Sequence, residues 1–96
     1  MSFQVISIEK NKKINAFDVV ISGGLEHDVF HVDVEVFKIA DREVQNISGE
    51  DALWKYFEYH PMMVNEVHQL VAKVYNGKKV EFPFEITNFL PMQVTA

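Results

Sequence analysis

The chain of 96 residues has a net charge of −5, and 48% of its residues are hydrophobic. A chain this short closes one hydrophobic core, and its apolar content is too high for a disordered protein. The lack of cysteine excludes disulfides, thiolate metal sites and a cysteine nucleophile, and the acidic balance disfavours nucleic acid and anionic membranes as partners.

Three strands are predicted in the N-terminal part of the chain. Alternating side chains predict a strand from Phe3 to Glu9 and a second from Ile14 to Ser22. The Gly23-Gly24 pair then supplies the positive φ angles of a tight hairpin. The clearest strand follows, because apolar side chains alternate with polar ones. Its apolar positions are Phe30, Val32, Val34 and Val36. We expect one face of this sheet to lie in the core and the other to meet water.

A pair of helices is predicted after the polar segment Asp41–Asn46, which is not assigned a strand. The sequence Ser48-Gly49-Glu50-Asp51 resembles a capping box in which Ser48 caps the first helix. Pro61 ends or kinks this helix because proline lacks an N–H, yet proline suits the first turn of a new helix. The joint between the two helices is therefore placed at His60-Pro61.

The second helix is predicted from valines at positions 64, 67, 71 and 74, and Asn76-Gly77 supplies its C-terminal stop. Alternating apolar side chains in residues 80–86 then predict an extended segment, which Pro83 places at a sheet edge or in extended packing against the helices. The tail from Asn88 is also apolar, and we expect it to dock on its own fold or on a partner. Its apolar residues are Phe89, Leu90, Met92 and Val94.

These elements predict an α+β fold, in which three N-terminal strands and a C-terminal edge strand form a small antiparallel sheet packed against two helices broken at Pro61. We expect a single domain over residues 1–96, and a homo-oligomer because so small a fold leaves apolar surface uncovered. The segment Met1–Gln4 lacks the layout of a signal peptide, and no run of about 18 apolar residues could span a bilayer. A cytoplasmic protein without a membrane segment is therefore expected.

One cluster of polar side chains has the chemistry of a metal site. Its members share strand parity and are expected on one sheet face; they are His27, His31, Asp33 and Glu35. Imidazole and carboxylate can bind a divalent cation, but neighbours on one strand face lie about 6.5–7 Å apart, so a ligand such as Asp18 would have to come from the next strand. An exposed antiparallel face has the same pattern without any metal, and no metal ligand is assigned.

No catalytic motif supports an enzyme. None of the serines lies in a Gly-x-Ser-x-Gly turn, and the chain has neither a P-loop nor a Gly-x-Gly-x-x-Gly turn. We therefore expect a protein without enzymatic activity and without a cofactor.

Aromatic residues and methionines are dense around the helix joint, more than one narrow helix face can bury. Tyr, Trp and Met are favoured at interfaces, although core packing explains part of the pattern. We assign five residues to partner binding: Trp54, Tyr56, Tyr59, Met62 and Met63.

The C-terminal half, from Val34 to Met92, resembles the SecB-like export chaperones. In that family a strand and a loop precede a short helix, a Tyr-x-Pro turn, a long helix ending in glycine and a Phe-Pro tail; here Tyr59-His60-Pro61, Gly77 and Phe82-Pro83 match. The family is usually longer, has four strands ahead of its helices where three are predicted here, and has an aromatic-proline pair in its long helix where this chain has Val64 and Asn65. The resemblance implies an acidic, oligomeric holdase that binds non-native polypeptide in apolar grooves.

Our leading hypothesis is a non-catalytic module that binds protein or extended polypeptide through the segment from Trp54 to Met63. The first alternative is an inhibitor or immunity-type protein whose acidic face meets a basic site on its partner. That face would contain Glu26, Asp28, Asp33 and Glu35. The second alternative is a metal-dependent enzyme built on His31, Asp33 and Glu35. Salt separates the first two, because charge-driven binding weakens as salt rises and apolar binding persists.

Overall fold

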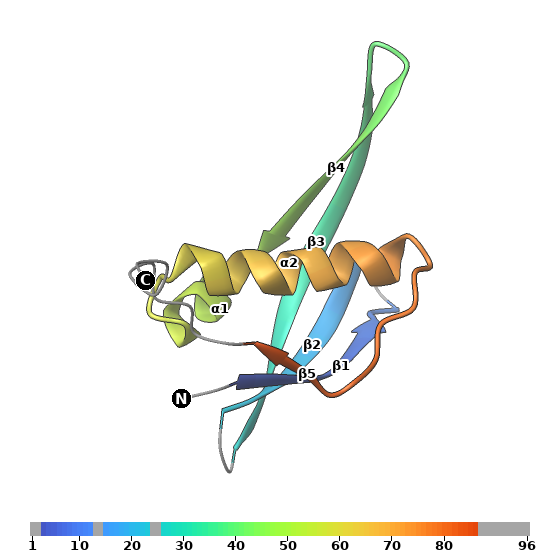
Figure 1. The fold of residues 1–96 in the computed structure, drawn as a ribbon. Coiled ribbons are helices and arrows are strands. Elements are labelled where there is room, and N and C mark those ends of the chain that lie inside the picture. Colours follow the sequence, from blue (N-terminus) through green and yellow to red (C-terminus); the bar gives the residue numbers. More distant parts are fainter. Residues whose placement is uncertain (1–2, 13–14, 24–25, 87–96) are drawn as a thin grey trace, which may run out of the picture.

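The computed structural model describes residues 3–12, 15–23 and 26–86. Strands β1 (Phe3–Lys10), β2 (Ala16–Ser22), β3 (His27–Ile39) and β4 (Arg42–Gly49) precede helices α1 (Asp51–Tyr56) and α2 (Pro61–Tyr75), and β5 (Phe84–Ile86) follows. All neighbouring strands are antiparallel, in the order β4-β3-β2-β1-β5 (Figure 1). The prediction of a mixed α+β fold is confirmed.

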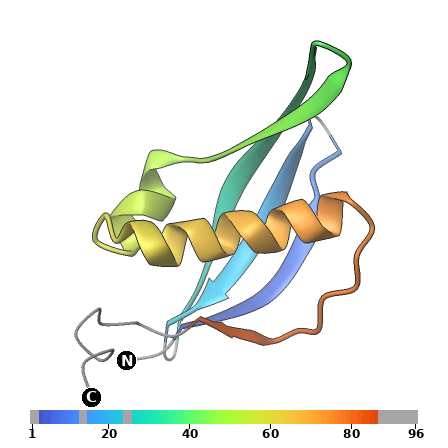
Figure 2. The same cartoon turned by 45° about the horizontal axis from the view of Figure 1, so that its top comes forward.

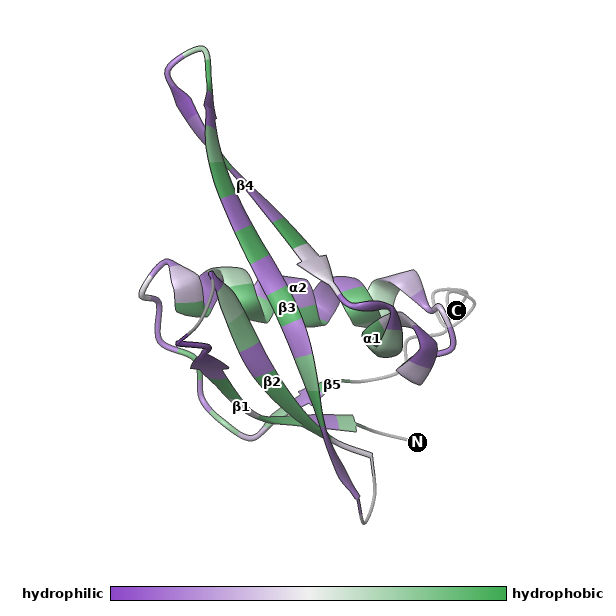
Figure 3. Ribbon diagram, turned by 180° about the vertical axis from the view of Figure 1, so that it is seen from behind, coloured by the Kyte–Doolittle hydropathy of each residue, from purple (hydrophilic) through white to green (hydrophobic). Residues whose placement is uncertain are grey.

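The helices cover one face of the sheet, with α2 running across the strands (Figure 2). Alternation decides which side chains meet them: in β3, Phe30, Val32 and Val34 are buried while His31 and Asp33 are exposed. The same alternation is visible along β3 from behind (Figure 3). From the helical side Leu53, Phe57, Met63, Val64, Val67, Leu70 and Val71 complete the core.

The sheet differs from the expected one in its number of N-terminal strands. The polar segment Asp41–Asn46 belongs largely to a fourth strand, β4, which pairs with β3 from Val32↔Gly49 to Ile39↔Arg42. Its residues are mostly exposed or half-buried, so the strand has no strong apolar alternation that a sequence pattern could reveal. Backbone pairing with the long β3 forms it instead.

The outer halves of β3 and β4 form an arm that projects beyond the rest of the sheet (Figure 1). Pairing between β2 and β3 stops at Asp33, whereas pairing between β3 and β4 continues to Ile39. Ala40 and Asp41 close the arm with φ angles of 49° and 66°, as a two-residue turn with a twist suited to hairpins requires. We call residues 35–46 the arm.

One pair of side chains connects the arm to α2. Nε2 of Gln45 donates to Oδ1 of Asn76 at 2.8 Å, and Nδ2 of Asn76 donates to Oε1 of Gln45 at 3.1 Å. Asn76 also caps its own helix by donating to the carbonyl of Ala72. The inner face of the arm is therefore held against the C-terminal end of α2.

The expected capping box is wrong. Ser48 lies inside β4 opposite Asp33, so the ladder fixes its backbone and Glu50 becomes the N-cap of α1, with no side-chain hydrogen bond to the helix. The helix ends at Tyr56, before the joint that was expected to terminate it. Pro61 occupies the first turn of α2 as predicted.

The predictions for the C-terminal part are confirmed within the described residues. Beyond α2, Gly77 has a φ of +75°, which glycine adopts without steric cost. The extended segment after it contributes β5, which lies at the sheet edge beside β1 and begins immediately after Pro83. Two predictions concern residues outside the described ranges. They are the conformation of Gly24 in the Gly23-Gly24 hairpin and the docking of the tail from Asn88.

Candidate functional site

The junction between α1 and α2 has a tightly hydrogen-bonded backbone. Glu58 and Tyr59 have φ angles of 54° and 58°, in the left-handed region that reverses the chain. The N–H of Tyr59 donates to the carbonyl of Trp54 at 2.7 Å, and the N–H of His60 donates to that of Phe57 at 3.0 Å. These bonds fix the direction in which the junction side chains point.

A hollow of about 400 Å³ opens on one side of the junction. We call it the aromatic hollow; it is lined by Phe3, Tyr56, Phe57, Glu58, Tyr59, His60, Pro61 and Met63. Its rings support one another edge to face, because the Phe3 centroid lies 5.5 Å from that of Tyr56 and 5.1 Å from that of Phe57. The aromatic wall of the hollow is therefore preformed in the free protein.

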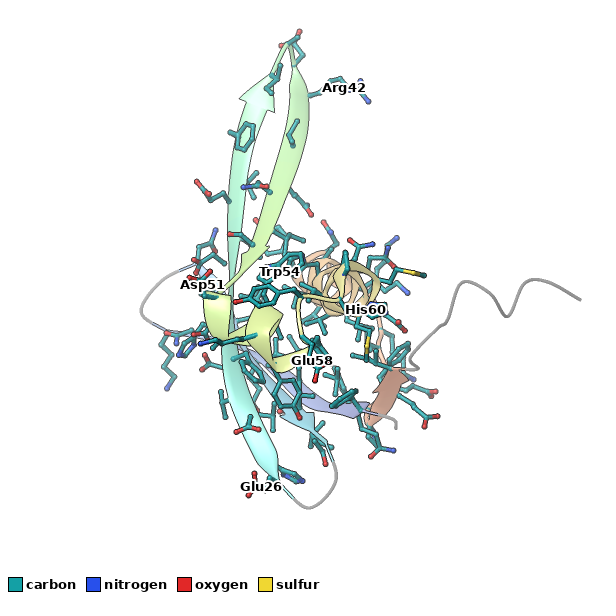
Figure 4. The ribbon with its side chains drawn as sticks, turned by 90° about the vertical axis from the view of Figure 1, so that its left-hand side faces the viewer. Glu26, Arg42, Asp51, Trp54, Glu58 and His60 are labelled. Atoms are coloured by element: carbon teal, nitrogen blue, oxygen red, sulfur yellow. The ribbon has the colours of Figure 1, made fainter. Side chains whose placement is uncertain are left out.

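A second hollow of about 510 Å³ lies on the other side of Pro61. We call it the tryptophan hollow; it is lined by Ile47, Trp54, Pro61, Met62, Asn65 and His68. The Trp54 and His68 rings meet edge to face at 6.3 Å. Figure 4 shows Trp54, His60 and Glu58 grouped at this end of the helical layer.

The residues assigned to partner binding all lie at the junction but differ in exposure. Tyr59 is 62% exposed and Met62 is 52% exposed, so each presents an apolar side chain to solvent beside a hollow. Trp54 and Tyr56 are half-buried and pack on the core. Met63 is 4% exposed and belongs to the core, because it follows Met62 by about 100° around the helix.

The aromatic hollow has acidic surroundings. Burial raises the pKa of the Tyr56 phenol above its ordinary value, and the negative charges of Asp28 and Glu26 raise it further. Glu58 lies in the wall itself, and no lysine or arginine lines this hollow. The electrostatics of the site therefore favour a positive group beside an apolar one.

The acidic face of the first alternative does not form a single surface. Asp28 pairs with Ile21 on the helix side of the sheet, whereas Asp33 and Glu35 alternate with the buried Val34 and point to the opposite side. Glu26 precedes β3 and lies with Asp28 near Tyr56. The four carboxylates thus divide into one pair at the junction and one pair on the outer sheet face.

The polar side chains of β3 do not converge as a metal site. Asp18 does reach His31 from the next strand, with its Oδ1 2.7 Å from Nδ1 of the ring. Within the described ranges, however, no group of three His, Cys, Asp or Glu side chains could hold a metal ion. The pair of His31 and Asp18 is a surface ion pair when the imidazole is protonated.

Two ring nitrogens near the junction are buried without a hydrogen-bond partner in the described part of the chain, namely Nδ1 of His60 and Nε2 of His68. Burial lowers the pKa of His68 below its ordinary value, which favours the neutral form of the ring that packs against Trp54. His68, on α2 itself, was not assigned to the site from the sequence. Phe3 and Ile47 were not assigned either, because they lie on strands β1 and β4 rather than on the helices. Only the packing of β1 and β4 against the helices brings them there.

Compared with protein-family models, curated proteins and solved structures, the chain has no significant match. No helix in the described ranges has the length and apolar character needed to cross a lipid bilayer.

Proposed function

We propose that this protein binds extended polypeptide at the junction between α1 and α2, without catalysis. The observation that carries the proposal is the exposure of Tyr59 and Met62, at 62% and 52%, beside two hollows that share Pro61. Exposed apolar side chains next to preformed concave surface are typical of interaction sites. A bound segment would cross Pro61 and place one side chain on each side of it.

The rigidity of the junction favours binding because little ordering is needed when a partner arrives. The left-handed residues and the hydrogen bonds of residues 57–60 fix the backbone, and the ring contacts among Phe3, Tyr56 and Phe57 fix the wall. Tyr59 and Met62 alone would lose rotamer freedom. A site built in this way retains more of its contact energy as affinity.

The charges at the junction indicate the kind of segment that fits. Glu58 lines the aromatic hollow, and Asp28 and Glu26 act on Tyr56. An apolar residue in this hollow, with a lysine or arginine next to it in the partner chain, would satisfy both features. We therefore propose polypeptide segments that alternate apolar and basic residues as the preferred class.

The resemblance to the SecB-like chaperones agrees with this proposal. That family has four strands ahead of its helices, and the fourth strand missing from the sequence-based prediction is present here as β4. Polypeptide holding by an acidic, oligomeric protein is what the resemblance implies. The junction hollows are the apolar surface on which such holding would depend.

Trp54 provides the measurement, because it is the only tryptophan in the chain and it lines one hollow. Its fluorescence is followed during titration with a synthetic Leu-Lys-Phe-Arg-containing peptide free of tryptophan, and with the same peptide after replacement of its Leu and Phe by Ser. Binding of the first peptide alone, retained at high salt, is expected; equal binding of both peptides or binding of neither would overturn the proposal.

Variants locate the site. Tyr59→Ser and Met62→Ser change exposed side chains, so both proteins should fold, and each should weaken binding about tenfold by losing one apolar contact. Val29→Ser is the matched control, because Val29 is 56% exposed on the sheet face away from the helices. Loss of binding in the control, with binding retained in both junction variants, would place the site elsewhere.

A further inference from the structure

The two edges of the sheet are protected to different degrees. At one edge, β5 spans only Phe84–Ile86 and follows Pro83, and both a short strand and a nearby proline discourage pairing with other chains. At the other edge, β4 spans Arg42–Gly49 and pairs with β3 in one uninterrupted register. It contains no lysine, proline or bulge, and no described strand covers it. Such an edge is a template for another strand.

The backbone groups that β4 presents can be deduced from its pairing with β3. Bonded and non-bonded pairs alternate along an antiparallel ladder, and the two-residue turn makes Ile39 and Arg42 a bonded pair. The N–H of Glu50 donates to the carbonyl of His31 at 3.2 Å, so His31 and Glu50 are also a bonded pair, as the alternation from Ile39 and Arg42 requires. The N–H and C=O groups of the alternate residues therefore point away from β3, and these residues are Glu43, Gln45, Ile47 and Gly49.

We infer that β4 pairs antiparallel with β4 of a second copy of this chain, centred on Gln45 facing Gln45. This register places Glu43 opposite Ile47 and Gly49 opposite Asp41 of the second copy, and it makes the two copies of Val44 diagonal neighbours across the seam. A strand that pairs with itself in antiparallel fashion generates a two-fold axis, so the interface closes as a dimer. The inference is independent of the proposed function at the junction.

Charge complementarity favours a second copy as the occupant. The chain has a net charge of −5, yet β4 itself carries one positive and one negative residue, Arg42 and Glu43. In the inferred register Arg42 faces Ser48, with Glu50 of the second copy diagonally adjacent and within reach of a long side chain. No like charges lie opposite each other, so the general repulsion between two acidic chains is absent at this seam.

The apolar residues of the arm also fit a second copy. Phe37, which is 44% exposed, is the cross-strand partner of Val44 on the sheet face away from the helices. Across the inferred seam, the two copies of Val44 are diagonal neighbours on that face. One strip then runs from Phe37 and Val44 of one copy to Val44 and Phe37 of the other. Two unsupported ribbons, each marginal in water, become the centre of one continuous sheet.

The test is the dimerisation of the full chain, measured by sedimentation equilibrium over a wide concentration range, with two matched variants. Glu43 and Lys38 face each other across the arm, and each has an N–H that points away from the other strand. Glu43→Pro should raise the dimer dissociation constant by about tenfold or more, because each dimer loses two N–H donors. Lys38→Pro alters the opposite edge and should leave the constant unchanged. A monomeric wild type, or a loss of dimer caused only by Lys38→Pro, would overturn the inference.

Cysteine cross-linking keeps the test decisive even when a proline variant fails to fold. The chain has no cysteine, so each variant carries a single thiol. Directly opposed Cα atoms of a bonded pair lie about 5.5 Å apart, within disulfide range, and Gln45→Cys should form a covalent dimer on mild oxidation. In Glu43→Cys the two thiols are offset by four residues, about 13 Å along the strand, and should remain free. Cross-linking of Glu43→Cys or Lys38→Cys in preference to Gln45→Cys would show a different seam or a different partner.

Discussion

Replacing Gly49 by alanine tests the closest approach between the sheet and α1. A Cβ at this position would lie 2.6 Å from Cδ2 of Leu53 and 3.0 Å from Nε2 of His68, whereas carbon atoms in ordinary contact are about 3.5–4.0 Å apart. Leu53 is fully buried and cannot turn away without displacing the core. Gly49 has no positive φ angle, so packing alone makes a side chain unfavourable here.

The expected magnitude combines two opposing effects. Overpacking of a tight interior by one methyl group costs about 1–3 kcal/mol, while alanine restricts the unfolded chain and stabilises by about 0.4–1 kcal/mol. We expect Gly49→Ala to lower the free energy of unfolding by about 1–2 kcal/mol. In a domain of this size each kcal/mol changes the melting temperature by about 4–8 °C, so the melting temperature should fall by about 5–15 °C.

The assay is urea unfolding followed by circular dichroism and by Trp54 fluorescence. Ser48→Ala, at the exposed neighbouring position, should change stability by less than about 0.5 kcal/mol. A double-mutant cycle identifies the cause, because Leu53→Ala removes the atom nearest the added methyl group and should make Gly49→Ala less costly. A neutral Gly49→Ala, or an equal cost in both backgrounds, would show that Leu53 does not limit the space at Gly49.

Three further predictions concern titration and the arm. Burial lowers the pKa of His68 below its ordinary value, so as the pH falls the ring is protonated in the unfolded chain before it is protonated in the folded chain. The free energy of unfolding that depends on the neutral ring is therefore complete above about pH 6.5 and decreases as the pH falls below that value. Unfolding free energies of His68→Leu should lose this part of the pH dependence, and identical pH profiles would contradict the assignment. Combining Ala40→Asn with Asp41→Gly suits the positive φ angles of the turn and should stabilise the chain by about 1 kcal/mol in thermal melts; a lower melting temperature would argue against this turn. Burial and then Asp28 raise the pKa of the Tyr56 phenol, so this phenol should ionise above its ordinary pH range in an ultraviolet absorbance titration. In Asp28→Asn it should ionise at a lower pH than in the wild type. An unchanged titration curve in the variant would show that Asp28 does not act on Tyr56.

The buried faces of the sheet and of α2 were predictable because the apolar residues in each follow one clear sequence period. Val32 and Val34 alternate with charged residues, and Val64, Val67 and Val71 recur at helical spacing. Pro61 and Gly77 mark the two ends of α2 through backbone preferences that act locally. Where burial on one face and local preference agree, the sequence alone indicates the element.

The strand β4 was not predictable for the opposite reason. It is an edge strand on a projecting arm, so neither of its faces is fully buried, and polar residues such as Gln45 and Asn46 satisfy it as well as apolar ones would. Its existence depends on partners in β3 that a local pattern does not reveal. The same competition removed Ser48 from its expected role as a helix cap.

The candidate site was predictable in position but not in composition. A dense run of aromatic residues and methionines predicts a binding surface at the junction, and Tyr59 and Met62 are exposed there. The helical stripe of Val64 and Val67 could have placed Met63 in the core from its spacing alone. The contribution of Phe3, from the N-terminal strand, required the packing of β1 against the helices.

The strand order has a consequence for how the chain folds. Strands β1 to β4 follow one another as hairpins, so each pair forms between segments that are close in sequence. The pairing of β1 with β5 joins Phe3 to Ile86 and closes a loop of almost the whole chain, which costs more conformational entropy than closing a hairpin. We expect this pairing to form last during folding and to open first in native-state hydrogen exchange. Since Phe3 is also a wall of the aromatic hollow, the last step of folding is the one that completes it.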